Sequence, residues 1–155
     1  MNEKEELDFI WGRIAGNVDR LMACFDGLSD DQVNWKPLDN ASTLYFLAAH
    51  TMSVINNNVL GTVCGKNVSR TREAEWMALG KSPAPLIKAW ADLKNDITAA
   101  IAGLPANAVA QDYPHPKRGS IPGREVLISA VRHSAEHMAH AELTRDLVKA
   151  RGASK

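Results

Sequence analysis

The sequence predicts an all-α protein, a four-helix bundle formed by a single domain that spans residues 1–155. Apolar residues recur every three or four positions along four long stretches, which is the period of a helix with one buried face. No stretch alternates apolar with polar residues as a half-buried strand does. A chain of 155 residues is long enough for one core, since a domain of this size buries about 70% of its unfolded surface.

The first long helix is predicted over residues 3–28. Its expected core positions are Leu7, Ile10, Ile14, Leu21, Phe25 and Leu28. Gly27 marks its end, because glycine readily adopts the left-handed conformation that closes helices. Ser29 and Gln32 then form a capping-box pattern, which predicts a short helical turn that ends before Pro37.

The second long helix is predicted to start within residues 40–42, with Ser42 as its N-cap. It carries His50 on the side that its apolar stripe turns toward the core. Residues 66–85 follow as a long connection that contains one turn of helix near residues 73–79. Connections of this length inside a compact domain cross between distant elements or carry function.

The third long helix covers residues 83–104, with Ser82 as its N-cap and a proline at a tolerated first-turn position. Residues 105–122 are rich in proline and are predicted as loop, with His115 at the surface. The fourth helix covers residues 123–151. Because the connection between the second and third helices is long, those two helices can run parallel, which gives an up-down-down-up bundle.

Three of the five histidines lie on the last predicted helix, at positions 133, 137 and 140. Their i, i+4, i+7 spacing projects them from one face. That face also carries the expected core residues Val126, Ala130, Thr144 and Leu147. Inward imidazoles need partners because an unpaired buried polar group costs about 1–3 kcal/mol.

A divalent metal ion would satisfy several of these histidines at once, and His50 lies on the inward side of another helix. A single inward histidine is more often bonded to a carbonyl or to an acid such as Glu136. A histidine-rich core without metal is therefore the structural alternative to a metal site. The metal site and the metal-free histidine core predict different functions for the chain.

Composition argues against charged macromolecular partners. Eighteen basic residues balance eighteen acidic ones, so no one-sided field attracts nucleic acid or an anionic membrane. No stretch is long and apolar enough for a membrane span, and the N-terminus lacks a leader pattern. Cys24 and Cys64 belong to no metal-binding cysteine motif, as in a reducing compartment. We expect a cytoplasmic protein that acts on a small molecule.

Three segments resemble a known family: Leu47-Ala48-Ala49-His50 on the second helix, His133-Ser134-Ala135-Glu136-His137 on the last, and residues 28–37 between the first two helices. In element order and length, nearly the whole chain is similar to the DinB/YfiT-like superfamily of bacterial metal-binding helical bundles. This resemblance implies a divalent metal, such as zinc, nickel or iron, held by His50, His133 and His137. His140 falls one turn later and enters as a residue that orients a ligand or lines the pocket.

The family is also similar to enzymes that use low-molecular-weight thiols, such as bacillithiol transferases and mycothiol-dependent maleylpyruvate isomerase. The resemblance therefore implies a metal-dependent thiol S-transferase, hydrolase or isomerase, with a thiol as cosubstrate. Three imidazoles leave a coordination position open, as in catalytic sites, and a bound thiol loses its proton. Glu136 is the nearest acid and is a candidate general base or orienting group. The alternative is a non-catalytic metal-binding or stress-related interaction bundle. The oligomeric state stays open, with a homodimer as one option.

Overall fold

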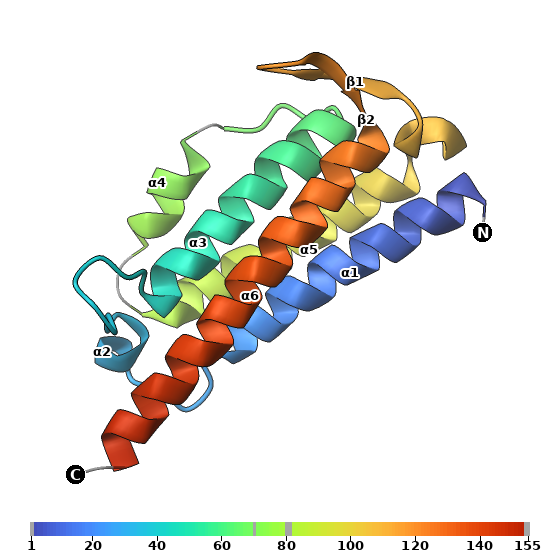
Figure 1. Ribbon diagram of the computed structural model, residues 1–155. Coiled ribbons are helices and arrows are strands. Elements are labelled where there is room, and N and C mark those ends of the chain that lie inside the picture. Colours follow the sequence, from blue (N-terminus) through green and yellow to red (C-terminus); the bar gives the residue numbers. More distant parts are fainter. Residues whose placement is uncertain (1, 70, 80–81, 154–155) are drawn as a thin grey trace.

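Figure 1 shows the computed structural model, which describes residues 2–69, 71–79 and 82–153. The fold is mostly helical and includes a small two-stranded sheet. Its α-helices are α1 (Glu3–Ala23), α2 (Asp30–Val33), α3 (Leu44–Ile55), α4 (Arg72–Met77), α5 (Pro83–Ala102) and α6 (Gly123–Ala153). The π-helix η1 (Asn56–Val63) directly continues α3, and the 3-10 helix η2 (Ala106–Val109) follows α5. α1, α5, α6 and the continuous α3–η1 segment lie side by side and pack against one another.

α1 begins with a capping box in which the Asn2 side chain accepts a hydrogen bond from the Glu5 amide at 2.9 Å and the Glu5 carboxylate accepts one from the Asn2 amide at 2.8 Å. Its buried face runs through the predicted apolar positions. The helix ends at Ala23, however, and the expected end at residue 28 was wrong. Backbone bonds tighten to i, i−3 over residues 24–26, and Gly27 then takes φ 74°.

α2 is the short turn that the capping box predicted: the Gln32 amide donates to Ser29 Oγ at 3.3 Å and the Ser29 amide to Gln32 Oε1 at 2.8 Å. The N-cap of α3 is Thr43, whose hydroxyl accepts from the Phe46 amide at 3.0 Å. The expected cap at Ser42 was wrong by one residue. Leu44 is fully buried, so the chain turns into helix directly before it.

The π-helix η1 was not predicted. The Cys64 amide donates to the carbonyl of Val59, five residues back, at 2.9 Å. The Thr62 hydroxyl similarly bonds the Asn57 carbonyl at 3.1 Å. Such wider turns are rare in proteins, and those that occur are often found at functional sites. They change the angular positions of the asparagines that follow α3 relative to His50.

Hydrogen bonds from two buried indoles join α1 and α5. Trp11 Nε1 on α1 donates to Thr98 Oγ1 at 3.0 Å, and Trp90 Nε1 on α5 donates to Asp19 Oδ1 at 2.8 Å. These tryptophans therefore serve packing between α1 and α5. Ser82 occupies the N-cap position of α5 as predicted, but its side chain makes no capping hydrogen bond.

α6 turns a slightly different face to the core than the sequence predicted. Leu127, Ala130, Ser134, Ala141 and Val148 are buried. The histidine stripe lies beside that face. His140 is exposed and Leu147 is 43% exposed, so their expected burial was wrong. The C-terminal end of α6 continues past the start of α3 (Figure 1), so the end of the stripe has no α3 beside it. α6 has 31 residues, but neither it nor another helix of the described segments is apolar enough to cross a membrane.

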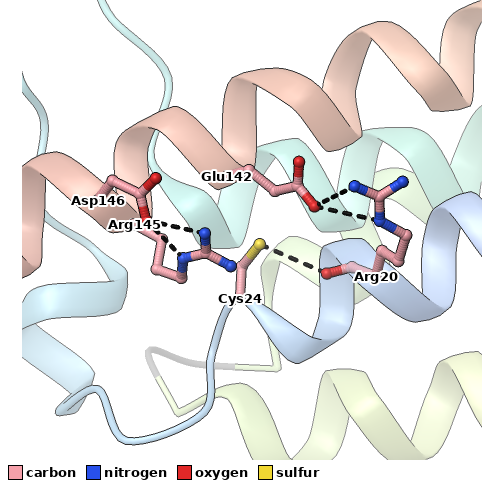
Figure 2. Close-up of polar contacts among 5 residues, drawn as sticks. All are labelled: Arg20, Cys24, Glu142, Arg145 and Asp146. Atoms are coloured by element: carbon pink, nitrogen blue, oxygen red, sulfur yellow. Dashed lines mark hydrogen bonds and ion pairs between the residues drawn. The ribbon is translucent and has the colours of Figure 1, made fainter.

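Polar contacts link α6 to the end of α1 (Figure 2). Arg20 donates to Glu142 Oε1 through Nη2 at 2.7 Å and through Nε at 3.2 Å. On α6 itself, Arg145 bonds its neighbour Asp146 at 2.9 Å. The Cys24 thiol donates to the Arg20 carbonyl at 3.4 Å, and burial raises its pKa. Cys24 is thus a protonated packing residue in the core.

The segment predicted as loop before α6 contains a β-hairpin, which corrects that expectation. β1 (Asp112–His115) pairs antiparallel with β2 (Gly119–Pro122), and Tyr113 lies opposite Ile121. Both of these side chains are buried. Gly119 takes φ 74° after the three-residue turn, a position that favours glycine. The strands are only four residues long and contain prolines, so their alternation is too short to show in the sequence.

Candidate metal centre

α3 and α6 bring three histidines together across their interface. His50 lies in the second turn of α3, and His133 and His137 lie one turn apart on α6. The ring centroids of His133 and His137 are 4.4 Å apart, and the His50 ring lies 5.1 and 5.3 Å from them. Each ring meets the others edge to face, so three imidazoles converge on one point.

The convergence has the dimensions of a metal site. One ligand nitrogen from each histidine lies within 4.8 Å of the other two, and all three side chains are partly buried. Zinc sites hold their imidazole nitrogens about 2.0–2.1 Å from the ion, so nitrogens grouped this closely could hold one such ion. These are the three residues that the family resemblance implied as ligands.

Two imidazole nitrogens of the site are buried without a hydrogen-bond partner in the described part of the chain. Among buried side-chain atoms of the described residues, His133 Nε2 and His137 Nδ1 have no hydrogen-bond partner. Unpaired buried nitrogens of this kind cost free energy unless a further group satisfies them. A cation accepts the lone pairs of neutral imidazoles, so the donor set fits a divalent metal ion.

Electrostatics keeps these rings neutral. Burial, followed by the charges that His137 and His50 would carry, lowers the pKa of His133 to about 4. The pKa of His137 is lowered by burial first and then by His50 and His140. At neutral pH both imidazoles therefore lack the extra proton and have a lone pair available for coordination.

Glu73 on α4 contacts the third histidine. Its Oε1 lies 3.2 Å from His50 Nδ1. α4 is held against α3 because the Tyr45 hydroxyl donates to the Trp76 carbonyl at 3.0 Å and the Trp76 side chain is buried. A carboxylate only accepts, so the contact places the hydrogen on Nδ1 and leaves Nε2 of His50 free for an ion.

The other candidates lie outside the cluster. His140 is exposed, and its ring centroid lies 6.0 Å from that of His137. Glu136 is exposed, and no hydrogen bond or ion pair found within the described segments involves it. Its charge acts at a distance by opposing the lowered pKa of His133 and His137. His115 lies on β1, where Nδ1 accepts from the Lys117 amide at 3.2 Å. Roles for Glu136 and His140 stay predictions.

Sequence reasoning missed two neighbours of the site. The Phe46 ring stacks on His50 at a centroid distance of 5.6 Å with an interplanar angle of 4°. Its position four residues before His50 was a usable signal, because i and i+4 meet on a helix. Glu73 had no such signal, since it follows His50 by 23 residues and reaches it through a tertiary contact.

Comparison with known proteins adds family membership to this geometry. A search of curated proteins finds no match. The family model of the DinB superfamily, however, matches residues 14–141, a range that includes His50, His133 and His137 and most of the 155 residues. The resemblance read from the sequence is thereby confirmed: the chain belongs to the DinB superfamily.

Proposed function

We propose that His50, His133 and His137 hold one divalent metal ion in a single-domain, up-down-down-up four-helix bundle. The observation that carries the proposal is the pair of buried, unpaired nitrogens on His133 and His137 that face a third imidazole across the helix interface. The chain directions of α1, α3, α5 and α6 in Figure 1 support the bundle arrangement. Membership in the DinB superfamily supports metal binding.

We further propose that the bound metal serves catalysis on a small molecule in the cytoplasm. Three histidines leave at least one coordination position open, whereas structural sites are closed by four protein ligands. A zinc-like ion in such a site lowers the pKa of a bound water or thiol. Thiol S-transfer, hydrolysis or isomerisation with a low-molecular-weight thiol is the class of reaction that this chemistry serves.

The side chains around the site have separable tasks in this proposal. His133 and His137 are preset relative to each other because they lie on one rigid helix. Glu73 orients His50 by accepting from Nδ1, and the stacked Phe46 ring opposes rotation of that imidazole. The partly buried position of the three rings limits solvent access to the open coordination position.

Turnover separates this proposal from a non-catalytic metal-binding or interaction role. Metal-loaded protein is incubated with a bacterial thiol, such as bacillithiol or mycothiol, and a chromogenic model electrophile. We expect S-conjugation that is lost in chelator-treated protein and in the His133→Ala variant. Full metal occupancy without turnover of any electrophile in a broad panel would favour the non-catalytic role.

A further inference from the structure

Two cavities lie between η1 and the β-hairpin, and the first is also lined by the first turns of α6. The first measures about 430 Å³, and its walls include Asn58, Thr62, Ile121, Val126, Ser129 and Arg132. The second measures about 930 Å³ and adds Asn57, Gly61, Lys66 and Val68. Both share Asn58, Thr62 and His115 as wall residues, so they adjoin each other.

Two residues that line the first cavity lie close to His133 along α6. Ser129 precedes His133 by four residues on α6, which is one turn or about 6 Å along the axis. Arg132 directly precedes His133. On the opposite wall, Asn58 follows His50 by eight residues on the continuous α3–η1 segment. The helices that carry the three histidines therefore also supply walls of this cavity.

The charges on the cavity walls do not balance. Arg118 is neutralised by Glu125, whose Oε1 lies 2.5 Å from its Nη1. Arg132 also lines the first cavity, and no hydrogen bond or ion pair of the described residues engages its guanidinium. Lys66, in the second cavity, likewise has no side-chain partner among them. Each cavity thus carries one uncompensated positive charge.

The wall between these charges offers polar and apolar surface. Thr62 and Asn58 border both cavities, whereas Ile121 and Val126 supply apolar contact in the first. Binding sites for small organic molecules combine apolar contact with a few placed polar groups.

We propose that these cavities bind a small organic carboxylate, with the Arg132 guanidinium pairing its carboxylate group. Arginine presents donors in a planar fork that matches the two carboxylate oxygens. One surplus positive charge in each of two adjoining cavities matches two separated carboxylate groups better than a phosphate dianion, whose two charges lie on one group. Lys66 in the second cavity suits a second carboxylate on the same molecule. Carboxylate binding in these cavities does not depend on whether the three histidines hold a metal.

Binding of succinate tests the inference directly, with uncharged succinamide as the matched probe. Amide signals of the folded protein are followed by NMR during titration. We expect succinate to shift the amides of Thr62, Ile121 and Ser129, and succinamide to bind at least about tenfold more weakly. Equal binding of both probes, tighter binding of inorganic phosphate, or shifts elsewhere on the protein would overturn the proposal.

Arginine variants locate the carboxylate. Arg132→Gln should weaken succinate binding about tenfold or more, since a charged hydrogen-bonding partner is lost. Arg13→Gln is the matched control, because Arg13 is an exposed α1 residue that does not line either cavity. The NMR spectrum of each variant shows whether it remains folded. Unchanged affinity in folded Arg132→Gln protein would overturn the assignment.

The same samples separate this inference from the proposed function. Metal content of Arg132→Gln should equal that of the unmodified protein, because Arg132 is not among the three converging residues. Metal retention with no succinate binding in the unmodified protein would refute the carboxylate site alone. Succinate binding by protein that retains no metal under any loading condition would refute the metal centre and leave the carboxylate site standing.

Discussion

Replacing Glu73 by glutamine removes the negative charge that the structure places 3.2 Å from His50 Nδ1. Groups that orient a metal-binding histidine in this way typically contribute 10–100-fold to metal affinity, equivalent to about 1.4–2.7 kcal/mol. The His50 and Glu73 side chains are 29% and 37% exposed, so solvent weakens their interaction. We therefore expect Glu73→Gln to lower zinc affinity by about tenfold, at the low end of that range.

Competition between the protein and a chromophoric zinc chelator measures this change. Glu75→Gln is the matched control, because Glu75 lies on the same helix, is exposed, and bonds Ser69 and Thr71 away from the histidines. The control should bind zinc as the unmodified protein does. Equal affinities for the two variants would show that Glu73 does not orient His50, and that the assigned tautomer of His50 is wrong.

Three further predictions concern stability and ligand roles. A Cβ at Gly123 would collide with the Ala108 carbonyl oxygen, so Gly123→Ala should lower the free energy of unfolding in urea by about 1–3 kcal/mol. Gly12 has open space around it, so Gly12→Ala should raise the free energy of unfolding by about 1 kcal/mol. In chelator-treated protein, His133 titrates near 4 when folded and near 6.5 when unfolded, so the unfolded chain binds more protons between these values. The free energy of unfolding should fall as pH drops from 6.5 to about 4, and it should fall less steeply in the His133→Gln variant. The same dependence on pH in the variant and the unmodified protein would contradict the burial of this imidazole. His140→Ala should keep the metal by elemental analysis and His133→Ala should lose it, since His140 lies about 10 Å along the axis from His133; the reverse result would assign the pair to His137 and His140.

The helical elements and the pairing of histidines could be predicted because both follow from short-range periodicity. His133 and His137 are one turn apart, so their proximity is a property of the helix itself. The inward side of the second helix was enough to add His50. The capping box of Ser29 and Gln32 is also local, and the structure confirms it.

The features that were missed depend on tertiary context. The burial of a stripe on α6 depends on which elements pack beside each part of it, and His140 is exposed although it shares a face with the partly buried His137. Glu73 reaches His50 only because Tyr45 and Trp76 fix α4 against α3. The short hairpin likewise forms as Tyr113 packs opposite Ile121, not from strand propensity.

The wider turns of η1 were missed for a related reason. Asn56 is fully buried in η1, although both polar atoms of its side chain lack a hydrogen-bond partner among the described residues. The connection was predicted to start only at residue 66, so the wider turns were missed and not the continuation of the helix. Packing of Val59 and Val63 into the core accompanies the continuation. No periodic signal in the sequence distinguishes a π-helix from a frayed helix end.

Elemental analysis of untagged protein tests the central claim most directly. Each chain should retain one divalent ion after gel filtration, and single alanine variants of His50, His133 and His137 should each retain almost none. The packing of the core does not require the ion, so each variant should stay folded. Circular dichroism checks this. An unmodified protein that stays folded and binds no zinc, nickel or iron after loading would contradict the account, and the three histidines would then form a metal-free part of the core.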